Sequence, residues 1–96
     1  MLQPLQSLLM QRKECTDLLL SADRILYCLE RGEPDALVRS GFSLAHIRRI
    51  QQADESGGQQ FCRIMKDHLK SRLVRLEQAI QHLRSGNWHD ASTKQS

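Results

Sequence analysis

Apolar residues recur three and four positions apart along the first third of this chain. Between Leu5 and Leu29 they fall at positions 5, 8, 9, 15, 18, 19, 22, 25, 26 and 29. Because an α-helix turns once every 3.6 residues, this spacing places them along one side of a long helix. Pro4 suits a first helical turn, and Gly32 with Pro34 marks an end, so we predict a helix over 4–31.

Two shorter helices are predicted next. Pro34 suits the first turn of a helix over 34–39, which Gly41 would end. Ser43 can cap a further helix over 43–54, because its hydroxyl can accept a hydrogen bond from an N–H group of the first turn. The glycine-containing segment after this helix predicts a loop.

The last and longest predicted helix, over 59–85, carries an apolar seam at heptad a and d positions. We expect this seam to contact another helix, and its members are Leu69, Leu73, Leu76, Ile80 and Leu83. The contact could be with a second copy, giving a homodimer, or with the 4–31 helix of the same chain, and the pattern fits both equally. Residues 87–96, apart from Trp88, predict a flexible polar tail.

The whole pattern predicts an all-α fold, a small helical bundle of three to four helices with a long C-terminal coiled-coil-like helix. Strand-like alternation of apolar and polar residues is absent from the sequence. We expect residues 1–86 to form a single helical domain, because the chain is too short for two hydrophobic cores. A chain of 96 residues is too short for most enzyme folds that enclose a pocket, and its sequence has no glycine-rich phosphate loop. We therefore expect neither enzymatic activity nor a cofactor.

Targeting features are also absent from the sequence. Charged residues interrupt the longest apolar runs within a turn or two. No run is therefore long enough to predict a membrane-spanning helix. The first residues lack the basic start and apolar stretch of a secretory signal. We expect a cytoplasmic protein without a membrane partner.

Three cysteines, Cys15, Cys28 and Cys62, are widely spaced and include no CxxC pair. Their odd number and spacing argue against a disulfide framework or a structural zinc site, so reduced thiols are expected. Cys62 with His68 is a weak candidate for a metal site, because six residues on a helix leave the two side chains out of register. We expect Cys62 to be a small apolar residue of the seam and predict no metal.

Basic residues outnumber acidic ones by 14 to 11, giving a net charge of +3. Arg48 and Arg49 belong to the densest basic zone and are candidates for contact with nucleic acid or with an acidic partner. The outline from Leu37 to Ile50 is that of two helices joined by a turn, as in a helix-turn-helix. We expect any DNA binding to be weak and indifferent to sequence.

Residues 41–85 resemble the C-terminal half of MerR-type transcription regulators. The resemblance rests on the segment Gly41-Phe42-Ser43-Leu44, on Cys62 at the start of a long helix and on the heptad seam after it. It implies a helix opened by that segment and a long dimerisation helix paired with its copy. The family's N-terminal DNA-binding domain is missing, and so is the cysteine-rich loop that completes its metal site. DNA-reading residues are therefore not carried over.

A second resemblance is to flagellar export chaperones of the FliT and FlgN type. It rests on the segment from Leu29 to Leu37, LERGEPDAL, which follows a long leading helix and precedes two more. It implies a protein that holds an unfolded export substrate along apolar helical grooves. The tryptophan often found beside the aspartate in that family is replaced by Pro34.

These observations predict a small non-enzymatic regulatory protein that acts by protein–protein contact. The first alternative is a dimerising effector module of the MerR type that acts on a regulatory protein. The second is an export chaperone for a flagellar or type III secretion substrate. Of the two, the sequence favours the regulatory module, because of the heptad seam and the spacing from Gly41-Phe42-Ser43-Leu44 to Cys62, and the chaperone is kept as the alternative.

Overall fold

The computed structural model describes residues 3–86, and these residues form helices joined by short turns. The four α-helices are α1 (Pro4–Glu30), α2 (Pro34–Arg39), α3 (Leu44–Gln51) and α4 (Gln59–Gln81). A π-helical turn, η1 (His82–Gly86), follows α4 directly. The predicted all-α fold with a long C-terminal helix is confirmed. The tail predicted over 87–96, including Trp88, lies outside the described residues.

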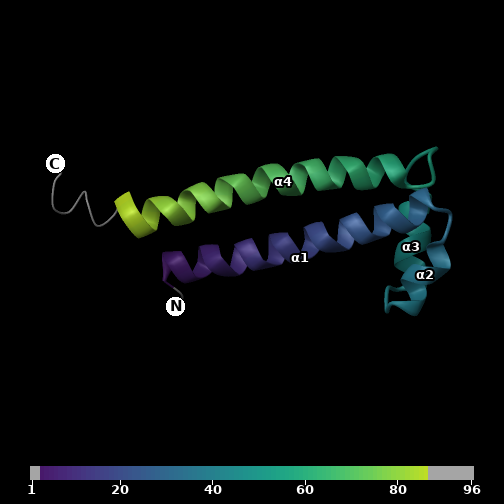
Figure 1. Ribbon diagram of the computed structural model, residues 1–96, viewed down its shortest axis with the longest axis horizontal. Helices are drawn as coiled ribbons and strands as arrows, with labels where there is room; N and C mark the ends of the chain where they lie inside the picture. The colour runs from purple at the N-terminus through teal and green to yellow at the C-terminus, as the bar shows by residue number, and fades with distance from the viewer. Residues whose placement is uncertain (1–2, 87–96) are drawn as a thin grey trace.

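The long helices α1 and α4 lie side by side and antiparallel, and form a hairpin (Figure 1). The short helices α2 and α3 fold against one end of it. The molecule measures 56 × 25 × 18 Å, with a radius of gyration of 18.4 Å. A compact domain of this length would have a radius of gyration of about 12–13 Å. Much of the hairpin is therefore flanked by solvent.

Three ion pairs join α1 to α4 and fix their register. As the residue number rises on α1 it falls on α4, as antiparallel helices require. Each pair is partly exposed to solvent, so each adds little to the stability of the fold and acts mainly on the alignment of the two helices. The pairs are Arg12–Glu77 at 2.9 Å, Asp23–Lys66 at 2.5 Å and Glu30–Arg63 at 2.8 Å.

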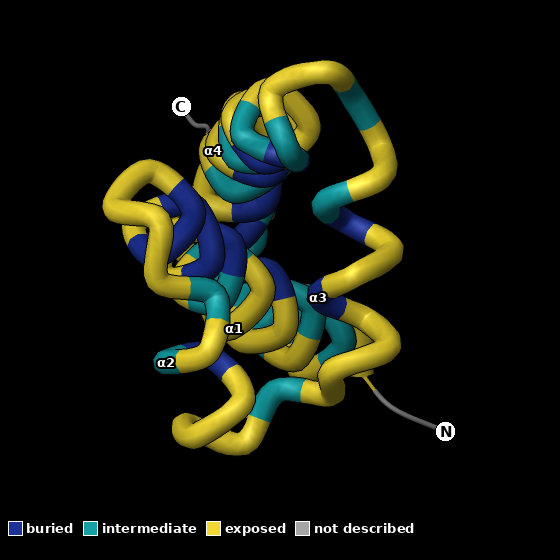
Figure 2. Tube along the Cα trace, turned by 90° about the vertical axis from the view of Figure 1, so that its right-hand side faces the viewer, coloured by how far each residue is buried: buried dark blue, intermediate teal, exposed yellow. Residues whose placement is uncertain are grey.

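Two apolar clusters hold the helices together. The α3-end cluster joins all four helices, and the hairpin cluster joins α1 to α4 further along. Figure 2 looks along the hairpin from the α2–α3 end and shows α3 to one side of the α1–α4 pair. The α3-end cluster contains Ile25, Leu26, Cys28, Leu29, Leu37, Ile47, Ile50 and Cys62. The hairpin cluster contains Cys15, Ala22, Leu69 and Leu76, with Leu8, Leu19 and Leu73 packed against them.

The first helix ends one residue before its predicted end, at Glu30, with Arg31 as its C-cap. Gly32 follows with a φ of +69°, a conformation that glycine adopts without the steric cost of a side chain. The N–H of Glu33 donates to the carbonyl of Cys28 at 2.9 Å, and that of Gly32 donates to Leu29 at 3.2 Å. These two bonds satisfy the last carbonyls of α1 and turn the chain back into α2. The bounds of α2 are those predicted.

The third helix is capped by Ser43, whose hydroxyl accepts from the N–H of His46 at 3.4 Å. It ends at Gln51, three residues before its predicted end, because the next residues form a turn organised by Asp54. One carboxylate oxygen of Asp54 accepts from the N–H groups of Ser56 at 2.9 Å and Gly58 at 3.1 Å. The other accepts from the N–H of Phe61 at 2.6 Å, in the first turn of α4. Asp54 therefore both ends α3 and supports the start of α4.

The α-helical hydrogen bonding of α4 ends at Gln81, whereas the sequence predicted one continuous helix over 59–85. The last five described residues form the π-helical turn η1. The hydroxyl of Ser85 donates to the carbonyl of Gln81 at 2.8 Å and competes for a backbone acceptor at this point.

Candidate protein-binding groove

An apolar groove of about 510 Å³ lies where α1, α3 and the first half of α4 meet. Its size is within the range of pockets that bind ligands or partner side chains. Twelve residues line it: Leu18, Ser21, Ala22 and Ile25 from α1; Phe61, Cys62, Met65 and Leu69 from α4; and His46, Arg49, Ile50 and Ala53 from α3 and the turn after it.

Helical spacing explains how the two long walls form. On α1 the other lining residues follow Leu18 by three, four and seven positions, which places them on one side of the helix. On α4 they follow Phe61 by one, four and eight positions. The third wall, α3, has only eight residues and therefore borders the hairpin at one end alone. The groove is open because no other described helix lies beside it along the hairpin.

Near the opening of the groove, its walls carry large apolar side chains that remain in contact with solvent. Leu18 is 53% exposed, and Phe61 and Met65 are each 37% exposed. The floor is buried and consists of Ala22, Ile25, Ile50, Cys62 and Leu69. Exposed apolar side chains gathered around a depression mark surfaces that bind other molecules.

The rim of the groove is basic on the α3 side. His46 and Arg49 lie there, and none of the twelve lining residues is acidic. Within residues 3–86, Arg49 takes part in no ion pair. Its guanidinium is therefore available to a negatively charged group of a ligand.

Arg48 and Arg49 lie on different surfaces of the molecule, although the sequence analysis named both as candidates for the same contact with nucleic acid or an acidic partner. Both are exposed, but only Arg49 lines the groove. Residues that are adjacent in a helix point about 100° apart, which explains the separation. Arg48 thus provides a matched control for Arg49.

The heptad seam of the last helix lies largely inside the molecule. Leu69, Leu76 and Ile80 are buried, with exposures of 4%, 7% and 2%, while Leu73 and Leu83 are partly buried. Leu69 and Leu76 pack with Cys15 and Ala22 of α1 in the hairpin cluster. The intramolecular alternative accounts for this burial. Pairing of two copies through the seam stays a prediction, and it would require α1 to give up these contacts.

The three cysteines are buried, and none of them is in a disulfide bond. Burial, and secondarily the carboxylate of Asp54, raise the pKa of the Cys62 thiol, which disfavours the thiolate that binds metals. The thiol of Cys15 donates to the carbonyl of Leu69 at 3.3 Å. Among residues 3–86, His, Cys, Asp and Glu side chains form no cluster of three or more that could hold a metal ion.

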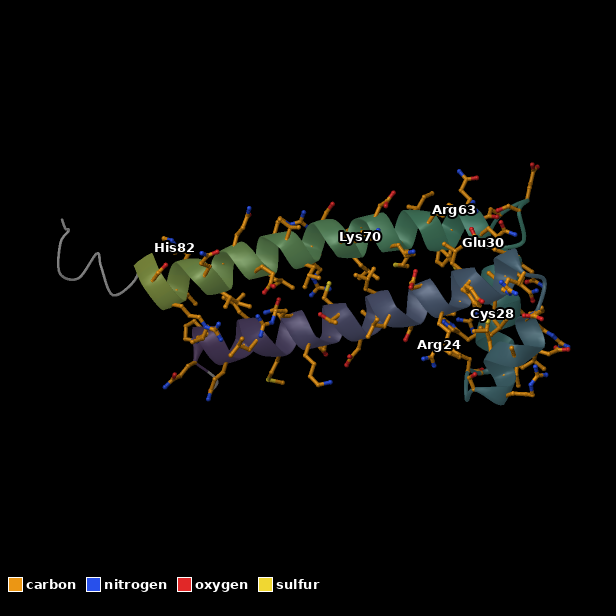
Figure 3. All side chains as sticks on the ribbon, in the orientation of Figure 1. Arg24, Cys28, Glu30, Arg63, Lys70 and His82 are labelled. Carbon is orange, nitrogen blue, oxygen red and sulfur yellow. The ribbon has the colours of Figure 1, made fainter. Side chains whose placement is uncertain are left out.

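A second depression, of about 430 Å³, lies on another side of α1 and has mixed charge. Its lining includes Leu20, Tyr27 and both members of the Asp23–Lys66 ion pair. Another of its lining residues, Glu30, forms an ion pair with Arg63 across the hairpin (Figure 3). Because three of its four charged lining residues form ion pairs and it exposes less apolar surface, this depression is a weaker candidate than the groove for binding an apolar partner.

Sequence reasoning did not identify the groove. Leu18 appeared in the apolar stripe of α1 without any sign that it stays exposed, and Phe61 and Met65 fell outside the heptad positions. Their spacing of four positions is a signal of a second apolar stripe on α4, beside the seam. The sequence analysis places Asp54 at the end of the predicted 43–54 helix, although aspartate followed by Ser56 and two glycines is typical of a side-chain-capped turn.

None of the helices described in residues 3–86 is apolar over a length that would cross a membrane. Comparison of the chain with family models, with curated proteins and with solved structures finds no match.

Proposed function

We propose that this protein is a non-enzymatic binding module that receives an amphipathic helix of another protein in the groove between α1, α3 and α4. The observation that carries the proposal is the exposure of Leu18, Phe61 and Met65 around a buried apolar floor. Amphipathic helices bind to such grooves by inserting apolar side chains spaced three and four residues apart. A third long helix on the hairpin would complete a bundle.

The export-chaperone form of this function has the stronger support. Its resemblance accounts for the long helix α1 and for an apolar groove that is free to hold a substrate. In this form the protein acts in the cytoplasm, binds a helical segment of an export substrate and releases it to the export machinery.

A regulatory form, in which the partner is a transcription regulator, is the second candidate. It is favoured by the start of α3, where Ser43 caps a helix immediately after Gly41-Phe42, as the MerR-type resemblance implies. The same groove would serve this partner. Dimerisation through α4 has less support, because α1 covers most of the seam.

The test compares two exposed leucines of α1. Leu18 is 53% exposed in the groove, and Leu20 is 64% exposed in the second depression. Tagged full-length protein, as wild type, Leu18→Glu and Leu20→Glu, is used to capture partners from nuclease-treated lysate of the native cells. Mass spectrometry identifies them, and binding is then measured with each purified partner.

We expect a partner that wild type and Leu20→Glu both bind and that Leu18→Glu loses. A flagellar or secretion substrate would establish the chaperone form, and a transcription regulator the regulatory form. Equal capture by both variants, with unchanged circular dichroism, would show that the groove is not the binding site.

A further inference from the structure

We infer that the groove selects amphipathic helices with acidic residues beside their apolar face, and that Arg49 is the residue that determines this specificity. The inference rests on the proposed function and adds the chemistry of the partner. Three observations support it: the length of the groove, its helical walls and the charge of its rim.

The groove has room for about two turns of a helix. Its α1 wall extends from Leu18 to Ile25 and its α4 wall from Phe61 to Leu69. At 1.5 Å per residue these walls are about 10–12 Å long. Over that length a partner helix presents apolar side chains at positions i, i+4 and i+7. Leu18, Phe61 and Met65 would contact them from both sides.

A helix fits these walls better than an extended strand does. Strand addition needs unpaired backbone N–H and C=O groups at a sheet edge. The long walls of the groove are helices, whose backbone groups bond within each helix, and they offer ridges of side chains instead. Contact is therefore made between side chains.

The charge of the rim identifies the polar face of the partner. Arg49 lies beside the apolar floor without an ion pair in residues 3–86, with His46 three positions before it on the same side of α3. A docked helix excludes water here, so a carboxylate beside Arg49 gains more than it would on an open surface, and a lysine there would be repelled. The expected ligand of the groove is therefore an acidic amphipathic helix of another protein.

The experiment uses two stapled helical peptides of about four turns each. Both carry leucines at i, i+4 and i+7, with glutamates at the flanking positions of one and lysines at those of the other. Binding to the full-length protein is measured by fluorescence anisotropy at low and at physiological salt. The variants are Arg49→Glu and, as the matched control on α3, Arg48→Glu.

We expect wild type to bind the glutamate peptide about tenfold more tightly than the lysine peptide. Arg49→Glu should reverse this preference, while Arg48→Glu should keep it. The preference should decrease as salt is raised, because part of the rim is open to solvent. Leu18→Glu should weaken both peptides, since it removes the shared apolar contact.

Each contrary outcome has its own meaning. Equal affinity of wild type for both peptides, or the same preference in Arg49→Glu, would overturn the acidic specificity and leave the groove as a helix-binding site. Failure of both peptides to bind wild type would overturn the inference together with the proposed function. Self-association of wild type in sedimentation, abolished by Leu18→Glu, would make a second copy the occupant and would also overturn the inference.

Discussion

Gly58, in the turn between α3 and α4, lets the two helices approach closely enough to form the groove. Its φ is +95°, and a Cβ atom built on it would lie 2.5 Å from the carbonyl oxygen of Ile50. Gly57 also has a positive φ, of +73°, but open space surrounds its Cβ position. The two neighbours therefore separate the cost of backbone conformation from the cost of a steric clash.

We expect Gly57→Ala to lower the free energy of unfolding by about 1–2 kcal/mol, because alanine resists the left-handed conformation. Gly58→Ala should lower it by about a further 1–3 kcal/mol, because the backbone of Ile50 must move. Urea unfolding of both variants checks this. Equal losses would indicate that α3 moves away from α4 without resistance.

Asp54 makes the stability of the α3–α4 turn depend on pH. The pKa of its carboxyl group lies below the usual value of 3.8, mainly because the hydroxyl of Ser56 donates to it and also because backbone N–H groups do. Because this pKa is lower in the folded than in the unfolded chain, the ionised carboxylate stabilises the fold. This contribution is fully present above the unfolded-state pKa and is lost as the pH falls through the folded-state pKa.

Asp54→Asn should therefore be less stable than wild type at neutral pH, and the difference should shrink as the pH falls below about 4. Thermal unfolding followed between neutral and acidic pH measures it. Glu55→Gln is the control, since Glu55 makes no hydrogen bond or ion pair among the described contacts and its replacement should leave the pH profile of wild type. A constant difference between Asp54→Asn and wild type would show that charge plays no part.

At the scale of the elements, the pairing of α1 with α4 depends on the apolar seam. Leu76 is 7% exposed and packs in the hairpin cluster, whereas Val74, on the same helix, is 54% exposed. We expect Leu76→Ala to lower the free energy of unfolding by about 2–5 kcal/mol through the cavity it leaves. Val74→Ala should change it by about 0.5 kcal/mol or less. Urea unfolding gives both values.

Light scattering on the same two variants tests the remaining possibility of a dimer. Because Leu76 contacts α1 of its own chain, Leu76→Ala should leave the molar mass of the folded protein unchanged. A wild-type dimer that becomes a monomer in Leu76→Ala would instead place the seam between two chains.

The helices could be predicted from the sequence, but the contacts between them could not. The periodicity of α1 and α4, Pro4 and the capping role of Ser43 were sufficient to predict four helices, because these signals are local. The heptad seam defines a stripe but not what covers it, so the partner of α4 stayed open. The groove was hidden for the same reason: its walls come from three segments, and only the tertiary fold leaves Leu18 and Met65 exposed while it buries Leu69.

At the scale of the whole molecule, the groove lies at the boundary between the two apolar clusters. Ile25, Ile50 and Cys62 of its floor belong to the α3-end cluster, and Ala22 and Leu69 belong to the hairpin cluster. In an elongated hairpin, clusters that share few contacts can open separately. A helix bound in the groove would contact both clusters and couple them.

Native-state hydrogen exchange distinguishes separate clusters from a single cooperative unit. In Leu76→Ala, amides of the hairpin cluster, such as those of Cys15 and Leu69, should exchange faster, while those of Ile25 and Ile47 in the α3-end cluster keep their protection. A uniform increase in exchange would contradict the separation of the molecule into two clusters.

Addition of the glutamate peptide should slow exchange in both clusters, since a ligand that binds only the folded groove stabilises both of the clusters that form it. Protection confined to one cluster would place the bound helix on that side alone.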